Sequence, residues 1–154
     1  MRKLVWVIGA AVVVLGGVVP GAVGGGAQPA PGECASVSRQ AELARYEPLP
    51  CAAEEANVKV AKVVAETEPC PRGGSPYTTY TSSARVCLIP NFVEGVCYRH
   101  DRQSGMRRVD CATTESLKVR KVARGAAECG DDRKVAYPEP PVTFCLVSHA
   151  PWLR

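Results

Sequence analysis

The sequence predicts a small, mainly β protein, built as a tandem two-repeat domain and stapled by disulfide bonds. Three observations support this fold class. First, the eight cysteines divide into two sets of four with similar gaps. Second, the segment VKVAKVVAETEPC (58–70) aligns without gaps on LKVRKVARGAAEC (117–129). Third, both repeats are rich in Val, Thr and Tyr and are interrupted by Pro and Gly, a composition that favours short strands.

Residues 1–27 have the pattern of a secretory signal peptide. Two basic residues precede an uninterrupted apolar run, 4–19, and a Pro then leads into the small residues that a signal peptidase needs. We expect cleavage after Ala27, with Ala22 and Gly24 as other candidate positions. The alternative is an uncleaved N-terminal anchor, because the apolar run and its Gly-rich tail approach the roughly 20 residues that span a bilayer.

The chain after residue 27 carries a nearly balanced charge. Loss of 1–27 removes Arg2 and Lys3 and no acidic residue, so the net charge falls from +4 to +2. A nucleic-acid-binding domain needs a concentrated basic face, and we therefore expect no nucleic-acid partner. The excess of Arg over Lys, with abundant Ala and Val and few Ile and Asn, is typical of a GC-rich genome and points to an actinobacterial host.

The duplication sets the domain organisation. The chain divides into a leader, a short linker (28–31), repeat one (32–90), a connection (91–94), repeat two (95–149) and a tail (150–154). Further anchors align between the repeats: GEC (32–34) with GVC (95–97), RVCLIP (85–90) with TFCLVS (143–148), and Tyr80 with Tyr137. If the two repeats bury one shared Val-rich face, removal of one should unfold the other.

All the cysteines follow the leader, and an even number in an exported chain indicates a disulfide framework. They are Cys34, Cys51, Cys70, Cys87, Cys97, Cys111, Cys129 and Cys145. Three connectivities apply the same pairing inside both repeats. We favour first with second and third with fourth, because each bond then closes one hairpin-like segment. Repeats of about 60 residues need such staples, and closing a loop of about 17 residues contributes on the order of 3 kcal/mol.

The expected strands follow the repeat. They are 34–38, 58–65, 77–81 and 85–89 in repeat one, and 96–100, 117–123, 134–137 and 142–147 in repeat two. Val58 and Val60 keep the period of two that a strand requires, but Val63 breaks the phase, so a β-bulge is expected there and at the equivalent place in repeat two. The segment 36–49 is also compatible with one short helix around residues 41–45.

Sequence patterns for catalysis, metal binding and cofactor binding are missing. The shortest gap between cysteines is ten residues, whereas structural zinc sites and dithiol redox centres use C-x2-C pairs. His100, beside Asp101, and His149 each occur in one repeat only, and no hydrolase or metalloprotease motif accompanies them. We therefore expect no catalytic, metal-ligating or cofactor-binding residue, and a protein that is not an enzyme.

Two segments are candidate binding surfaces. The tyrosines of PYTTYTSS (76–83) combine rings and hydroxyl groups that suit contacts with a sugar or a peptide. The simpler interpretation of this segment is an amphipathic strand. The disulfide-framed segment CPRGGSPYTTY (70–80) is the candidate inhibitory loop if the protein is a secreted protease inhibitor.

The run CLIPNFVEGVCY (87–98), preceded by KVAKVV, EPCP and YTTYT, resembles the LppU-type conserved region of exported actinobacterial proteins. The resemblance covers nearly all of residues 32–149 through short, cysteine-centred motifs. A looser similarity, which includes RVDC (108–111), links the chain to the septum-formation type of actinobacterial domain. The resemblance implies an extracytoplasmic domain and supplies no catalytic residues. Most members are lipoproteins or membrane-attached, whereas here Cys34 follows Glu33 and no lipobox is present.

These patterns predict a secreted or cell-envelope protein with a non-catalytic binding or structural role. The expected partner is an extracytoplasmic protein or an envelope component. Membrane attachment is expected only if residues 1–27 are retained as an anchor. The alternatives are a membrane-tethered extracytoplasmic accessory protein and a secreted protease inhibitor.

Overall fold

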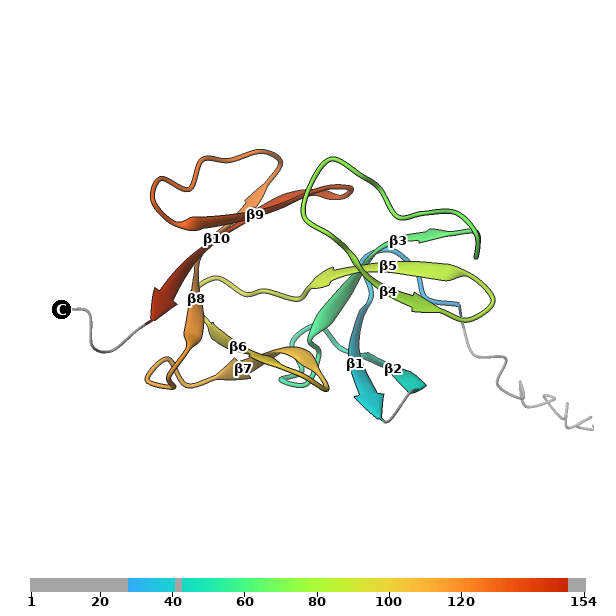
Figure 1. Cartoon of the computed structure of the whole chain (residues 1–154), viewed down its shortest axis with the longest axis horizontal. Helices are drawn as coiled ribbons and strands as arrows, with labels where there is room; N and C mark the ends of the chain where they lie inside the picture. The colour runs from blue at the N-terminus through green and yellow to red at the C-terminus, as the bar shows by residue number, and fades with distance from the viewer. Residues whose placement is uncertain (1–27, 41–42, 150–154) are drawn as a thin grey trace, which may run out of the picture.

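The computed structural model of the chain describes residues 28–40 and 43–149. Within these ranges the chain forms two antiparallel five-stranded sheets, and none of the described residues is helical (Figure 1). The mainly β fold class predicted from the sequence is confirmed. The predicted leader (1–27) and tail (150–154) lie outside the described residues.

The strands of the first unit are β1 (Cys34–Gln40), β2 (Leu43–Leu49), β3 (Val58–Val64), β4 (Thr78–Thr81) and β5 (Arg85–Pro90). Those of the second unit are β6 (Cys97–Asp101), β7 (Gly105–Val109), β8 (Ser116–Arg124), β9 (Arg133–Pro138) and β10 (Pro141–His149). All eight strands expected from the sequence are present, and β2 and β7 are additional.

The two units have the same topology. The strand order is β2-β1-β3-β5-β4 in the first sheet and β7-β6-β8-β10-β9 in the second. Equivalent backbone hydrogen bonds hold the same corner of each unit: Gly32 N donates to Val60 O and Gly95 N donates to Val119 O, both at 2.8 Å. The duplication predicted from the cysteine spacing is therefore present in three dimensions.

The segment that was compatible with a short helix forms a β-hairpin. β1 and β2 pair along their whole length, and residues 43–45 belong to β2. The helix prediction is wrong because the hairpin buries Ala35 and sets Val37 beside Tyr46 against the core. That apolar burial outweighs the weak helix propensity of so short a segment. The second unit has the same hairpin, β6–β7, which turns before Gly105 at φ +68°.

The β-bulge expected in each repeat is present. The register of β3 on β5 shifts between Val60 and Lys62, which leaves Ala61 without a partner on β5. Arg120 is skipped in the same way where β8 pairs with β10. The bulge restores the phase between Val60 and Val63, so both side chains reach the same core.

Each unit contains two disulfide bonds in the pairing favoured from the sequence. The bonds are Cys34–Cys51, Cys70–Cys87, Cys97–Cys111 and Cys129–Cys145. The first bond of each unit joins the first strand to the end of the β1–β2 or β6–β7 hairpin. The second bond ties the loop before the last hairpin to its final strand.

One anchor of the sequence alignment is wrong. Tyr80 of β4 faces Val86 on β5, whereas Phe144, the counterpart of Val86 on β10, faces Val135. Tyr137 lies two residues further along β9 than the true counterpart of Tyr80. The difference arises because the β9–β10 hairpin extends further than β4–β5 before it turns.

The units lie side by side, joined by the connection between β5 and β6 (Figure 1). Successive residues of β5 serve different cores, because side chains alternate across a strand. Leu88 packs in a core made only of first-unit residues. Ile89 points the other way and packs with Ala61 against Tyr98 and Phe144 of the second unit. One face of the first sheet thus packs in the core of the first unit, and residues of its other face pack against the second unit.

Candidate functional site

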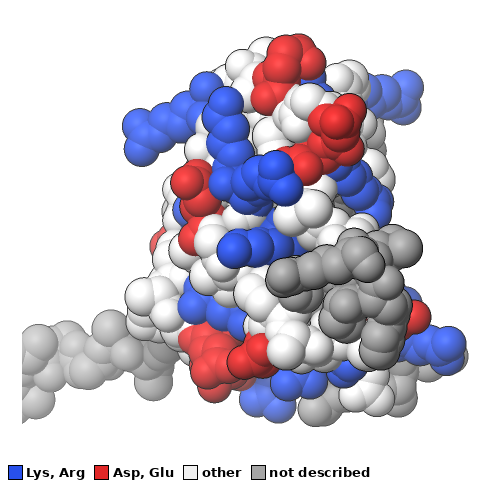
Figure 2. Space-filling view, turned by 90° about the vertical axis from the view of Figure 1, so that its left-hand side faces the viewer, with Lys and Arg blue, Asp and Glu red and all other residues white. Residues whose placement is uncertain are grey.

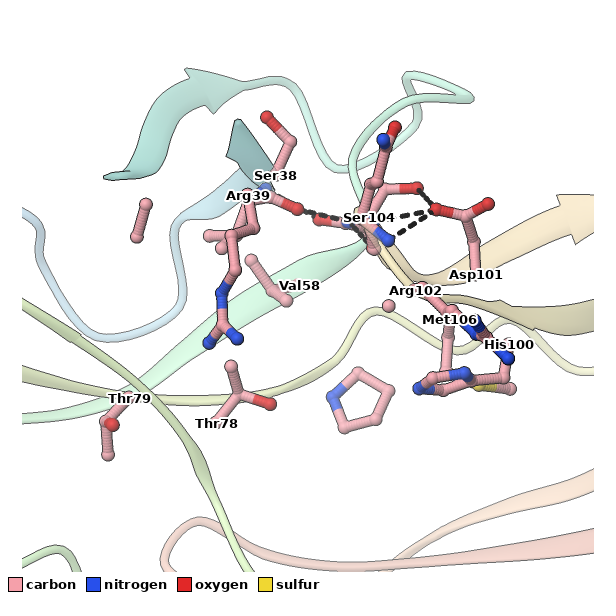
Figure 3. A pocket seen from close by; sticks show the side chains of 16 residues that line it. Ser38, Arg39, Val58, Thr78, Thr79, His100, Asp101, Arg102, Ser104 and Met106 are labelled. Carbon is pink, nitrogen blue, oxygen red and sulfur yellow. Dashed lines mark hydrogen bonds between the residues drawn. The ribbon is translucent and has the colours of Figure 1, made fainter. Parts of the chain in front are cut away.

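A groove of about 450 Å³ lies between the two units, where the β6–β7 turn approaches the first sheet (Figure 3). The first unit contributes Arg39 of β1 and Thr78 of β4. The second unit contributes His100, Arg102 and Met106 from the β6–β7 hairpin. Because both units line it, this groove depends on how the two copies pack together.

One wall of the groove is held by the side chain of Asn57. Strand β1 pairs with β3 only at its first two residues and then diverges. In the opening, Asn57 Oδ1 accepts a hydrogen bond from Val37 N at 2.8 Å and Asn57 Nδ2 donates to Val37 O at 2.9 Å. The same Nδ2 donates to Ser104 O, and Arg39 N donates to Gln103 O at 2.6 Å. The β6–β7 turn is therefore fixed to the edge of β1.

The turn itself is organised by Asp101. Its Oδ1 accepts hydrogen bonds from Gln103 N, Ser104 N and the Ser104 hydroxyl, each at 2.9 Å. These bonds, foremost the one from the Ser104 backbone, hold the pKa of Asp101 below its ordinary value. The carboxylate stabilises the turn and is directed towards Ser104 (Figure 3). Asp101 thus has a structural role, and its neighbour His100 is exposed.

The groove has a cationic character on both sides. Arg39 extends its guanidinium into the groove towards Thr78 (Figure 3). Arg102 lines the groove from the second unit. Within residues 28–40 and 43–149, neither arginine forms an ion pair with a carboxylate. Val58, Pro90 and Met106 add apolar surface to the same groove.

The tyrosines of the PYTTYTSS segment do not form a shared binding surface. Tyr77 turns towards the second unit, where its hydroxyl donates to Glu139 O at 2.7 Å and accepts from Glu139 N at 3.1 Å. Its ring also contacts Tyr137, with 5.0 Å between centroids. Tyr80 stacks on Tyr46 of β2 at 5.1 Å. The two tyrosines therefore connect strands and units rather than project together.

The disulfide-framed loop 70–77 docks on the second unit. Ser75 N donates to Ala136 O at 2.7 Å, and Ala136 N donates to Ser75 Oγ at 3.2 Å. Gly74 lies so close to β9 that a Cβ atom there would be 2.5 Å from Ala136 O. The tip of the loop, Arg72 to Gly74, is exposed, as is Pro76, whereas Ser75 and Tyr77 are half-buried. We call residues 70–77 the clasp, because they hold the second unit against the first.

The remaining candidate residues take structural positions. All eight cysteines are in disulfide bonds. In the described part of the chain, no group of three or more His, Cys, Asp and Glu side chains gathers as a metal site would require. Residues 28–40 and 43–149 contain no helix that is long and apolar enough to cross a membrane. Of His149 only the backbone is described, as the last residue of β10.

The surface at the second-unit end of the molecule is mixed in charge. Figure 2 shows basic and acidic side chains interspersed over this end. Two pairs lie within ionic contact: Arg120 Nε is 3.1 Å from Asp132 Oδ2, and Lys134 Nζ is 3.5 Å from Glu128 Oε1. The exposed Lys134–Glu128 pair adds little to stability, and both pairs break up any continuous basic face.

Sequence reasoning missed Arg39, Asn57 and Arg102 as members of one site. Only Asn57 differs between the repeats, where it corresponds to Ser116, whereas Arg39 and Arg102 occupy equivalent positions, each five residues after the first cysteine of its repeat. In a duplicated chain, polar residues that differ between equivalent positions mark where the copies have separate roles. No known protein family, no curated protein and no solved structure matches this chain.

Proposed function

We propose that this chain is an exported, non-catalytic binding domain that works outside the cytoplasm and binds its ligand in the groove between the two units. The groove is the observation that carries the proposal. It is a concave site with fixed walls, of the size usual for small ligands, and it combines charged, hydroxyl and apolar side chains.

Two features support a place outside the cytoplasm. Four disulfide bonds in so small a protein are typical of an oxidising compartment. The basic residues, apolar run and small residues of 1–27, which have the pattern of a secretory signal peptide, agree with the same location. On this proposal, residues 1–27 direct export, and the domain is secreted if they are cleaved and membrane-tethered if they are retained.

A non-catalytic role is supported by the structural contacts that occupy the cysteine sulfur atoms and the Asp101 carboxylate. The cysteine sulfur atoms are all committed to disulfide bonds, so none serves as a nucleophile. The Asp101 carboxylate is held by the backbone of its own turn. The groove is left with groups that recognise a ligand, such as a guanidinium and hydroxyls.

Export and oxidation are tested by the intact mass of the protein from an actinobacterial host, alkylated without reduction. A chain lacking the leader and carrying no alkyl group is expected. A full-length mass in the membrane fraction would indicate the tethered alternative. Two or more alkylated thiols would contradict the disulfide framework on which the proposal depends.

Groove binding is tested with isotope-labelled, oxidised protein and a solubilised envelope fraction of the host. We expect the backbone amide signals of Thr78, Thr79 and Met106 to shift. The variant Thr78→Trp, which fills the groove with an indole, should abolish the shifts. A wild-type protein whose groove signals do not respond to any envelope material would refute the proposal.

The second candidate function is inhibition of a trypsin-like protease by the tip of the clasp. It is favoured by one observation: the exposed Arg72 is held between the Cys70–Cys87 bond and the Ser75 hydrogen bonds to β9. A loop fixed on both sides loses little entropy on binding. Titration of trypsin with the protein tests this idea, and inhibition should disappear in Arg72→Ala. Cleavage after Arg72 without inhibition would exclude it.

A further inference from the structure

We infer that the groove binds an organic ligand that carries a carboxylate beside an apolar group. The inference deepens the proposed binding function and rests on it. It is carried by the juxtaposition of three features on one groove: an arginine that forms no ion pair with a carboxylate of the described residues, the hydroxyl group of Thr78, and an apolar strip.

The position of Arg39 in its strand explains why its charge enters the groove. Side chains of β1 alternate between two faces, and Arg39 shares a face with Ala35 and Val37, which pack in the first core. Its neighbour Arg45 faces Ser38 across the hairpin and so projects to the other side. Arg39 is therefore the charged residue at the end of a face of β1 that is otherwise apolar.

A carboxylate matches this cation better than a neutral group does. The guanidinium is planar and presents a fork of N–H donors that binds a carboxylate through two parallel hydrogen bonds. Thr78 lies beside it in the groove and offers a hydroxyl donor (Figure 3). Arg102 adds a second positive charge from across the groove. Asp101 also lines the groove and carries a negative charge, but its carboxylate is hydrogen-bonded to Gln103 and Ser104 and forms no ion pair with either arginine.

The apolar strip indicates what the carboxylate is attached to. Val58 and Pro90 face each other across β3 and β5, and Met106 lies opposite them on the second unit. Methionine adapts its shape to irregular apolar ligands. A volume of about 450 Å³ accommodates a small organic acid or the last two or three residues of a peptide. Both sources offer the same chemistry, a carboxylate next to a hydrocarbon group.

The experiment compares two tripeptides that end in leucine, one with a free carboxylate and one with a C-terminal amide. Each is titrated into the labelled, oxidised, full-length exported protein and followed by amide chemical shifts. We expect the acid to shift the signals of Thr78, Thr79 and Met106. The affinity of the amide should be lower than that of the acid by a factor of roughly ten or more. Hexanoate, tested in parallel, reports whether a simple organic acid suffices or peptide groups are also needed.

Two variants separate the charge from the fold. Arg39→Gln keeps the backbone bond to Gln103 and should weaken binding of the acid roughly tenfold or more. Arg45→Gln removes an arginine from the opposite face of the same hairpin and should leave the affinity unchanged. Both variants should keep the dispersed amide spectrum of the parent, because neither side chain lies in a core.

The outcomes distinguish this inference from the proposed function. Equal binding of acid and amide, or full affinity in Arg39→Gln, would refute the carboxylate while leaving the groove as a binding site. If neither the tripeptide acid nor hexanoate shifts the groove signals, the carboxylate inference is also refuted. The proposed function would survive that result if envelope material still shifts the groove signals of the parent protein and leaves those of Thr78→Trp unchanged. A loss of both responses would remove the proposed function as well.

Discussion

The side-chain amide of Asn57 binds the backbone of Val37 twice, through its oxygen at 2.8 Å and its nitrogen at 2.9 Å. A paired strand would make the same two bonds, so Asn57 replaces a missing backbone partner at the place where β1 leaves β3. The equivalent residue of the second unit, Ser116, donates instead to Cys111 O at 3.3 Å. The two copies thus differ at the point where the groove forms.

Replacement of Asn57 by serine, the residue found at the equivalent position of the second unit, should destabilise the protein. The shorter side chain leaves the N–H and C=O of Val37 and the C=O of Ser104 without their partner. Unsatisfied buried polar groups cost about 1–3 kcal/mol each in the free energy of unfolding, and relaxation of the exposed turn keeps the expected total at about 2 kcal/mol. Urea unfolding with the disulfide bonds intact measures this change.

Gln103→Ala is the matched control for Asn57→Ser, because Gln103 holds the same turn through its backbone oxygen and its side chain is exposed. Its effect should stay within about 0.5 kcal/mol, the usual range for surface substitutions. An Asn57→Ser variant as stable as this control would mean that the Asn57 hydrogen bonds do not hold the edge of β1.

Gly74→Ala should loosen the clasp from the second unit. The added Cβ would lie 2.5 Å from Ala136 O and 2.9 Å from Pro138 Cδ, so the loop or β9 must move. Overpacking of this kind typically costs about 1–3 kcal/mol in stability, and the hydrogen bonds of Ser75 would be strained. Hydrogen exchange at the Ser75 and Ala136 amides measures the loosening directly. The neighbouring Arg72→Ala, at the exposed tip, should leave both exchange rates unchanged.

How far the sequence predicts this fold depends on whether a feature is local and duplicated. The strands, the cysteine pairing and the bulge at Ala61 follow from patterns that occur twice, and a pattern that must work in both copies is strongly constrained. The β1–β2 hairpin was missed because residues 41–45 have a local preference for helix, and only the burial of Val37 and Tyr46 against the core overrides it.

The groove could not be predicted from patterns that occur in both repeats. Arg39 and Arg102 lie in different repeats, and their approach depends on which faces of the two sheets meet. That choice follows from Ile89 and Ala61, which extend the first sheet's outer face into the second core. Short apolar side chains of this kind are equally compatible with a solvent-facing position, so the sequence did not identify them as an interface.

The stability of the protein should fall between pH 10 and pH 12 because of Tyr137. Burial raises the pKa of Tyr137 from 10.0 to about 12. Below pH 10 the phenol is protonated in both the folded and the unfolded chain. Above pH 10 the unfolded chain releases the proton while the folded one retains it, so the free energy of unfolding decreases as the pH rises towards 12.

Urea unfolding at several pH values measures this slope, and Tyr137→Phe should make it shallower. The slope should not vanish, because burial also raises the pKa of Tyr46 and Tyr77. The ring of Tyr137 packs in the second core, so phenylalanine keeps the apolar contact and only the titrating group is removed. An unchanged slope in Tyr137→Phe would show that this phenol does not titrate abnormally.

The two units should differ in their ability to fold alone. The core of the first unit consists of Ala35, Val58, Val60, Val86 and Leu88, all from its own strands. In the second unit, the rings of Tyr98 and Phe144 are covered by Phe92 of the connection, at 4.8 Å and 5.2 Å between centroids, and by Ile89 of β5. We therefore expect the second unit to depend on the first for its stability, and the first unit not to depend on the second.

We expect residues 28–94, with their two disulfide bonds, to give a dispersed amide spectrum and a cooperative unfolding transition. Residues 95–154 should bind a hydrophobic dye and unfold without cooperativity, because Tyr98 and Phe144 lose their cover. Residues 91–154, which regain Phe92 but not Ile89 or Ala61, should be intermediate. Addition of 28–94 to 95–154 should restore the dispersion, since the clasp and Ile89 then return in trans. A cooperatively folded 95–154 fragment would show that the second core is complete without the first unit.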